Sequence, residues 1–224
     1  MAQDKFNILV YGGTFDPPHL GHKAVVCEVL KRYKVSKLLV MPAPFPAGAD
    51  GNHKDPTLPF KTRLKLCNQL FDDWFPTVEV SKLEERLEAP QFTLKTVVAL
   101  KEQYPDKSLG LIIGSDQFKL LPKWRNPVEI VGICDLVVVQ RDGDDLPALA
   151  SEVFKELGLE LMWTSNIRAD VKGYSSRLHV IKEGVSDASS TEIRGRLDRS
   201  EGIPEEWMLG ETVQYLRNKK EKSR

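Results

Sequence analysis

The segment Gly12–His22 constrains the fold more than any other part of the chain. It reads GGTFDPPHLGH and directly follows the apolar run Phe6–Tyr11, which predicts a buried strand, a glycine turn and then a helix. Glycines let the backbone approach an anion without a Cβ in the way, and a helix start offers unpaired N–H groups. His19 and His22 are three residues apart, so they share one face of that helix. The segment therefore predicts a phosphate site.

Strand-like and helical patterns alternate along the rest of the chain. Apolar runs predict strands at 6–11, 37–41, 77–80, 109–113, 135–140 and about 178–181. Helical spacing predicts helices at 20–33, 60–74, 91–104, 146–157, about 190–199 and about 204–216, with shorter helical turns near 115 and at 128–132. This alternation is typical of an α/β fold, here a Rossmann-like, doubly wound and mostly parallel sheet with helices on both faces. Such sheets bind ligands at the carboxyl ends of their strands, where the candidate motifs fall.

We expect one domain over residues 1–224, with a helical C-terminal part from about 186. The basic residues at 218–224 are expected to form a loose tail, since chain ends are commonly loose. Five prolines indicate a long loop at 42–59, and loops of that length are usually functional or mobile. Residues 164–176 are interpreted as an inserted loop.

Charge is balanced, with 32 Lys and Arg against 32 Asp and Glu. No global field therefore draws the chain toward nucleic acid or an anionic membrane, and phosphate affinity must come from local placement. No apolar stretch approaches the ~20 residues that span a bilayer, and the N-terminus lacks a secretory pattern. Three widely spaced cysteines, Cys27, Cys67 and Cys134, favour free thiols in a reducing compartment. We expect a soluble, cytoplasmic protein.

The segment Ser189–Arg194 is a second candidate anion site. Ser189 and Glu192 fit a capping box at a helix start, so capping a helix is one interpretation. The other adds Arg194, because Arg grips phosphate oxygens in a fixed fork. Two anion-binding helix ends could then hold one triphosphate from both sides.

A third motif follows the strand at 109–113, where Gly114, Ser115 and Asp116 precede Leu-Pro-Lys-Trp at 121–124. Asp116 could accept hydrogen bonds from ribose hydroxyls or simply cap a helix. Trp124 lies between two prolines in a polar context, so it could stack on a flat ring or pack at the surface of the core. His53 and Lys54 in the loop at 42–59 could close over phosphates or be solvated, and Thr93 could meet a ligand or cap its helix.

Together these segments resemble the bacterial nicotinate (nicotinamide) mononucleotide adenylyltransferases, which belong to the His-x-Gly-His nucleotidyltransferase superfamily. The resemblance runs from about residue 6 to 217. The first motif alone indicates only the superfamily, and the Ile-Gly-Ser-Asp segment with Leu-Pro-x-Trp narrows it to pyridine nucleotide enzymes. The resemblance implies an enzyme that moves AMP from ATP to nicotinate mononucleotide. The products are nicotinate adenine dinucleotide and pyrophosphate, in NAD biosynthesis, and the implied cofactor is Mg²⁺.

The resemblance also implies roles for residues at matching positions. The catalytic residues would be His19, His22 and Arg194. The ATP-binding residues would be Gly12, Gly13, Thr14, Phe15, Gly114, Asp116, Ser189, Ser190 and Thr191. The pyridine mononucleotide would be bound by Asp16, Lys54, Thr93 and Trp124. Mg²⁺ would be bound mainly through phosphates, with Asp16 as the one protein group considered for it.

The chain departs from the family pattern in four places. The loop at 42–59 is longer than usual, Gln91-Phe92-Thr93 replaces Ser-Tyr-Thr, and Asp142 replaces the proline expected after Arg141. The segment 164–176 is the fourth departure. These differences leave the role of Lys54 open.

Several alternatives stay open from the sequence. Nicotinamide mononucleotide could be the acceptor, or AMP or CMP could pass to another phosphorylated acceptor such as phosphopantetheine or glycerol phosphate. The His-x-Gly-His motif also resembles that of class I aminoacyl-tRNA synthetases, but the neutral charge and short chain speak against nucleic-acid binding. A catalytically inactive nucleotide sensor is a third class. We expect ATP and nicotinate mononucleotide as partners, without nucleic acid or membrane. The oligomeric state is open, with a homodimer as one option.

Overall fold

One mixed sheet of eight strands organises the computed structural model, which describes residues 4–46, 55–74, 76–141, 143, 145–182 and 188–221. The strand order is β3-β2-β1-β4-β5-β8-β7-β6, and only β7 runs against the others. The strands are β1 (Lys5–Gly13), β2 (Lys34–Pro42), β3 (Val78–Val80), β4 (Leu109–Gly114), β5 (Asp135–Val139), β6 (Leu161–Ser165), β7 (Arg168–Val171) and β8 (Arg177–Ile181). The predicted α/β, mostly parallel sheet is confirmed.

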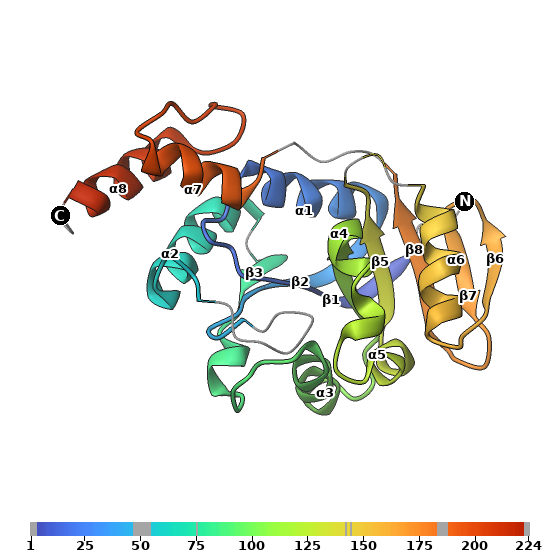
Figure 1. Cartoon of the computed structure of the whole chain (residues 1–224). Helices are drawn as coiled ribbons and strands as arrows, with labels where there is room; N and C mark the ends of the chain where they lie inside the picture. Colours follow the sequence, from blue (N-terminus) through green and yellow to red (C-terminus); the bar gives the residue numbers. More distant parts are fainter. Residues whose placement is uncertain are drawn as a thin grey trace.

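Helices cover both faces of this sheet (Figure 1). Alternate residues of β1 enter different cores: Leu9 packs with residues of α1 (Leu20–Arg32) and α2 (Phe60–Phe71), whereas Ile8 packs with the helices of the opposite face. The opposite face is covered by α3 (Thr93–Gln103), α4 (Ser115–Phe118), α5 (Pro127–Ile133) and α6 (Leu146–Glu156). Burial on both sides explains why the central strands read as continuous apolar runs.

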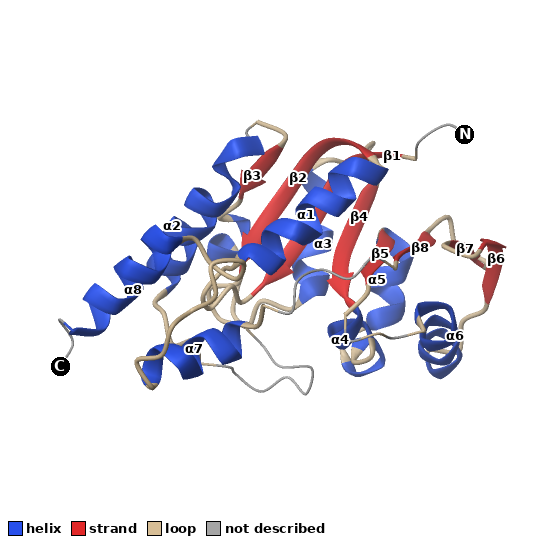
Figure 2. Ribbon diagram, turned by 90° about the horizontal axis from the view of Figure 1, so that it is seen from above, coloured by secondary structure: helices blue, strands red, loops and turns tan. Residues whose placement is uncertain are grey.

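A third, smaller core attaches the C-terminal helices to α2. It contains Leu66 of α2, Ile193 of α7 (Ser190–Asp198), Met208, and Leu216 of α8 (Gly210–Glu221). Viewed from above, α2, α7 and α8 gather at one end of the sheet and the β6–β7 hairpin lies at the other (Figure 2). This core brings the second predicted anion motif, at the start of α7, to the end of the sheet where α1 begins.

The switch point of the topology lies between β1 and β4. Strand β1 pairs with β2 on one side and with β4 on the other, both in parallel. The chain leaves β1 toward β2 and later returns to add β4 on the opposite side, so the connections diverge above the carboxyl ends of these two strands. Open α/β sheets bind their ligands in this crevice. Gly12 and Gly13 end β1 at this edge, and Gly114 ends β4.

The sequence pattern was wrong in two segments. Residues 164–176, interpreted as an inserted loop, include the end of β6 and all of β7, which form an antiparallel hairpin. Strand β6 is at the sheet edge, where Met162 is 46% exposed, so the apolar run that identifies a buried strand is absent. Helix α8 begins at Gly210, later than predicted, and includes residues 218–221 of the expected loose tail. Residues 222–224 lie outside the described residues.

Other expectations concern membrane spans and cysteines. In the described part of the chain, no helix combines the length and the apolar character needed to cross a bilayer. The three cysteines are free, with Cys67 and Cys134 buried and Cys27 partly exposed. Burial raises the pKa of the Cys134 thiol to about 12, so this thiol is protonated at neutral pH and unsuited to nucleophilic chemistry.

Removal of one aromatic ring tests how α6 is held on the sheet. Phe154 is 1% exposed and packs against Phe118, with ring centroids 6.4 Å apart. We expect Phe154→Ala to lower the free energy of unfolding by about 3–5 kcal/mol, the usual cost of such a cavity. Ser151→Ala on the exposed side of α6 is the control, with an expected change below about 0.5 kcal/mol. Urea unfolding measures both, and equal changes in the two variants would contradict this packing.

Candidate active site

The turn between β1 and α1 carries the first motif to the crevice. Phe15 takes a left-handed conformation with φ of 50° and is 2% exposed, packing edge-on against Tyr11. Its buried ring therefore packs under the turn and cannot contact a ligand, so only the main chain of Phe15 is available for binding. Gly21 permits the close approach of His19, because a Cβ at position 21 would lie 3.0 Å from the His19 ring. The glycine of the His-x-Gly-His motif thus makes room for the first histidine.

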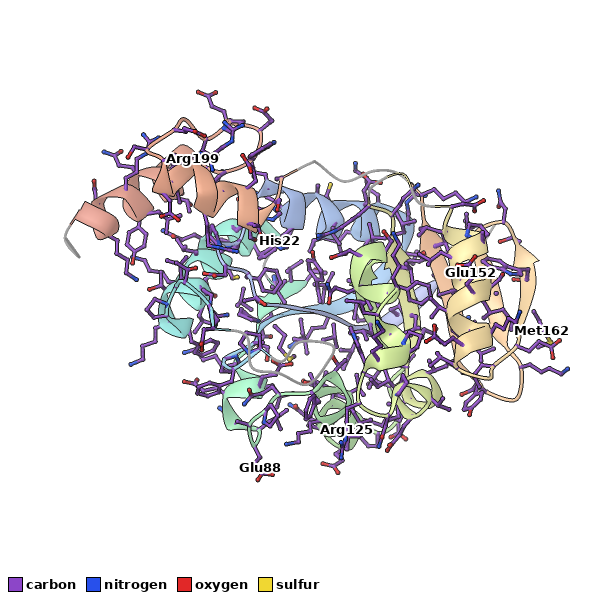
Figure 3. All side chains as sticks on the ribbon, in the orientation of Figure 1. His22, Glu88, Arg125, Glu152, Met162 and Arg199 are labelled. Carbon is purple, nitrogen blue, oxygen red and sulfur yellow. The ribbon has the colours of Figure 1, made fainter. Side chains whose placement is uncertain are left out.

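The two histidines of the motif stack at the start of α1. Their ring centroids are 3.8 Å apart, and the His19 N–H donates a hydrogen bond to Nδ1 of His22 at 3.1 Å. Since Nδ1 of His22 accepts, the proton of the neutral ring is on Nε2, which makes Nε2 a donor for a ligand. Figure 3 shows His22 between α1 and the sheet, beside α7. The two rings therefore lie side by side, as their three-residue spacing predicts.

Both imidazoles are neutral in the free chain at pH 7. Burial lowers the pKa of His19 to about 3, and Arg141 adds to the effect. Burial, then His19 and Arg141, also hold the pKa of His22 well below its usual range. The histidines can therefore donate hydrogen bonds to phosphate, and they become positively charged only if bound negative charge raises their pKa values.

Side chains of α7 contact the same turn. The Ser190 hydroxyl donates to the carbonyl of Pro17 at 2.9 Å, and Arg194 donates through Nη1 to the carbonyl of Asp16. Arg194 also donates to the Thr191 hydroxyl at 3.2 Å. The turn after β1 and the α7 motif thus lie side by side, as predicted.

The predicted capping box at the start of α7 was wrong. Ser189 is the N-cap residue, but its side chain makes no capping hydrogen bond. Glu192 instead forms an ion pair with Arg196, with 3.1 Å between Oε1 and Nε. The Ser189 side chain therefore does not compete for the N–H groups of the first helical turn.

Asp16 is already occupied by main-chain donors. Its Oδ2 accepts from the Thr57 N–H at 2.7 Å and its Oδ1 from the Leu58 N–H at 2.8 Å, and the side chain is 5% exposed. Arg194 lies 3.7 Å from Oδ2. In this arrangement Asp16 ties the turn to the following loop.

The far side of the crevice contains a residue that sequence reasoning did not assign. Arg141 follows β5, and its Nε lies 3.7 Å from Oδ1 of Asp116. The Ser115 hydroxyl accepts from the Arg141 N–H at 2.9 Å and donates to its carbonyl at 3.2 Å. A Cβ on Gly114 would lie 2.4 Å from Asp116 and 3.0 Å from Arg141. The sequence offered one indication of a role for Arg141: it is a charged residue that follows an apolar strand, at the end of the sheet where ligands bind.

Two of the residues predicted to bind the pyridine mononucleotide, Trp124 and Thr93, are described by the structure. Trp124 is half-buried and packs against the core that includes residues of α3 and α5. Thr93 is the first residue of α3 and is partly exposed. Helix α3 is held to the segment after β3 by a buried hydrogen bond from the Thr96 hydroxyl to Glu84, at 2.7 Å, and burial raises the pKa of Glu84 to about 7. Lys54 lies outside the described residues.

Comparisons with known proteins give the family. A profile described as cytidylyltransferase-like matches residues 10–196, so the chain belongs to the cytidylyltransferase-like family. A relative from Fusobacterium nucleatum, named "Probable nicotinate-nucleotide adenylyltransferase", is 31% identical over 88% of this chain and 90% of its own length. A relative of the same name from Shewanella sp. (strain ANA-3) is 28% identical over 94% of this chain and 96% of its own. These matches place the chain among the nicotinate-nucleotide adenylyltransferases.

Solved structures show the same fold. Plasmodium falciparum nicotinic acid mononucleotide adenylyltransferase complexed with APC matches with a TM-score of 0.68 at 17% identity, covering 96% of each chain. The same enzyme complexed with NaAD gives 0.66 at 18% identity and 94% coverage of each chain. The family resemblance found in the sequence is therefore confirmed, whereas the roles of the individual residues stay predictions.

The low histidine pKa values predict how stability changes with pH. An unfolded histidine titrates near pH 6.5, so the unfolded chain binds more protons than the folded one below that pH. The contribution of His19 to the free energy of unfolding is therefore complete above pH 6.5. It is lost as the pH falls toward 3, the pKa of His19 in the folded chain. Between pH 7.5 and 5.5, His19→Gln should lose about 1.4 kcal/mol less unfolding free energy than the wild type. Urea unfolding at both pH values measures this, and parallel losses would contradict a neutral His19.

Proposed function

We propose that this chain transfers AMP from ATP to nicotinate mononucleotide, forming nicotinate adenine dinucleotide and pyrophosphate. The observation that carries the proposal is the convergence of the His19–His22 pair with Ser190 and Arg194 of α7 on one turn at the switch point. The names of the relatives and the ligands of the structural neighbours support the substrate pair. NAD biosynthesis is the pathway in which such a product is used.

The chemistry needs positioning and charge stabilisation rather than a covalent intermediate. The 5′-phosphate of the acceptor attacks the α-phosphorus of ATP in line, the bond to the β-phosphate oxygen breaks, and pyrophosphate leaves. His22 donates from Nε2 to phosphate oxygens as negative charge builds up, and His19 stacks beside it. Arg194 either gives up its hydrogen bond to the Asp16 carbonyl or keeps it and donates to the outer phosphates through its other guanidinium N–H groups. On the β4–β5 side, Arg141 adds a second cation and Asp116 accepts from ribose hydroxyls.

We propose Mg²⁺ as the cofactor, held as a complex with ATP. When bound with ATP, the ion would supply positive charge that offsets the charge of the phosphates. The described residues contain no group of three or more His, Cys, Asp or Glu side chains suited to a metal, and the carboxylate of Asp16 already accepts two main-chain hydrogen bonds. Phosphate oxygens and water would therefore supply most ligands of the ion.

A nicotinate acceptor is favoured over nicotinamide by the start of α3. The N–H groups of Lys95 and Thr96 bond to the Phe92 carbonyl, whereas those of Thr93 and Leu94 have no acceptor among the described residues. A helix start with free N–H groups attracts a carboxylate, and the neutral amide of nicotinamide gains less. This supports the choice of acceptor, which the assay below decides.

Pyrophosphate release tests the function directly. The purified chain is incubated with ATP and Mg²⁺ and with nicotinate mononucleotide, nicotinamide mononucleotide, phosphopantetheine or glycerol phosphate in turn. We expect release with the nicotinate form, at a kcat/KM at least about tenfold above that for the amide, because ~1.4 kcal/mol of carboxylate recognition gives that ratio. Release with neither pyridine nucleotide would overturn the proposal. Replacing ATP with CTP checks the nucleotide that is transferred.

Loss of the Trp124 ring should selectively weaken binding of the acceptor substrate. Stacking on a heteroaromatic ring contributes about 1–1.5 kcal/mol, so Trp124→Ala should raise the KM for nicotinate mononucleotide about 5- to 12-fold and leave the KM for ATP nearly unchanged. Trp163→Ala is a matched control, because Trp163 is also half-buried against the same core but belongs to β6 at the far edge. Equal increases for both substrates would argue against stacking.

A further inference from the structure

Arg63 is the largest fully buried side chain of the described residues. It is 1% exposed and lies on the core-facing side of α2, between Thr62 and Leu64, which are also buried. A charged side chain in such a place is unfavourable unless hydrogen bonds or an ion pair compensate for the loss of water. Burial lowers the pKa of Arg63 from its ordinary value, and the negative charge of Asp16 opposes that shift. Arg63 stays charged, because guanidinium groups are effectively always protonated in proteins.

The guanidinium donates to three main-chain carbonyls from two segments. Nη1 donates to Thr14 at 2.6 Å, Nε to Leu58 at 3.0 Å and Nη2 to Pro44 at 3.3 Å. No carboxylate among the described residues lies within ion-pair distance of Arg63. Its hydrogen bonds therefore orient main-chain groups in the turn after β1 and at both ends of the loop at 42–59.

Asp16 makes the reciprocal contact from the other side. Its carboxylate accepts from the Thr57 and Leu58 N–H groups, so Leu58 is held by its N–H through Asp16 and by its carbonyl through Arg63. We call Arg63 and Asp16, with the backbone groups they bind, the Arg63 clamp. It fixes the turn that carries the histidines to the loop that carries predicted acceptor residue Lys54.

We propose that Arg63 is a positioning residue for AMP transfer. By holding the Thr14 carbonyl, it sets the orientation of the peptide groups around Gly13, Thr14 and Phe15, which the proposed function places beside the phosphates. By holding Leu58 and Pro44, it fixes the ends of the acceptor-side loop at a set distance from that turn. Lysine cannot replace it, because one ammonium group lacks the planar fork that reaches three carbonyls in three directions. This role rests on the proposed function, since it concerns the geometry in which that reaction occurs.

The test compares Arg63→Lys with Arg177→Lys. Arg177 is the control arginine: it is partly exposed and binds Asp135 at 3.0 Å. It lies at the start of β8, whereas the proposed site lies where β1 and β4 end. Both variants are assayed for pyrophosphate release well below their Tm, alongside the wild type. A misplacement of about 1 Å can cost about 100-fold in rate, so we expect kcat of Arg63→Lys to fall about 10- to 100-fold and that of Arg177→Lys to stay within about threefold of wild type. Arg63→Lys at wild-type kcat, or an equal loss in Arg177→Lys at equal Tm, would overturn the proposal.

Amide hydrogen exchange separates failure of the clamp from failure of the proposed function. In the absence of any nucleotide, Arg63→Lys should speed exchange at residues 13–16 and 57–58 at least about tenfold, while strands β4 and β5 keep wild-type protection. Arg177→Lys should leave the first two segments unchanged. Unchanged exchange there in Arg63→Lys would overturn the clamp whatever the acceptor assay finds. Faster exchange without AMP transfer by the wild type would instead reject the function while keeping the clamp.

Discussion

The structure depends on holding in place a turn that has no regular secondary structure of its own. In the proposed reaction the chain between β1 and α1 presents peptide groups to phosphate, so these groups are not paired with each other. Side chains and carbonyls from elsewhere hold it instead: Arg63 of α2, Ser190 and Arg194 of α7, and the Trp207 carbonyl, which accepts from the Leu20 N–H at 2.8 Å. The third core docks the C-terminal helices on α2, so it also holds in place the α7 side chains that contact this turn.

Local charge, rather than net charge, supplies the electrostatics of the site. The chain carries equal numbers of basic and acidic residues, yet Arg141 and Arg194 reach the crevice from opposite sides and Arg63 lies beneath the turn. Burial in the first place, and the charge of Arg141 in addition, lower the pKa values of His19 and His22, so both rings stay neutral until anionic phosphate arrives. Such a site strengthens its hydrogen bonds as charge develops on the reacting phosphates, because its groups need not reorganise.

Local sequence patterns were enough to predict the central fold and the first motif. Burial on both faces makes β1 an unbroken apolar run, and Gly13 and Gly21 mark positions where a Cβ would crowd the rings of Phe15 and His19. The β6–β7 hairpin was missed because an exposed edge strand leaves no such run. Arg63 and Arg141 were not assigned because their importance comes from contacts with residues far away in the sequence. The Ser189 capping box was wrong because Glu192 found a partner, Arg196, one turn further along the helix.

The central claim is that the histidine pair and α7 bind one triphosphate between them. A crystal structure of the chain with a non-hydrolysable ATP analogue and Mg²⁺ tests it most directly. The account predicts phosphate oxygens within hydrogen-bond distance of both Nε2 of His22 and the guanidinium of Arg194. A triphosphate that contacts only one of these two groups, or that binds away from the carboxyl ends of β1 and β4, would contradict it.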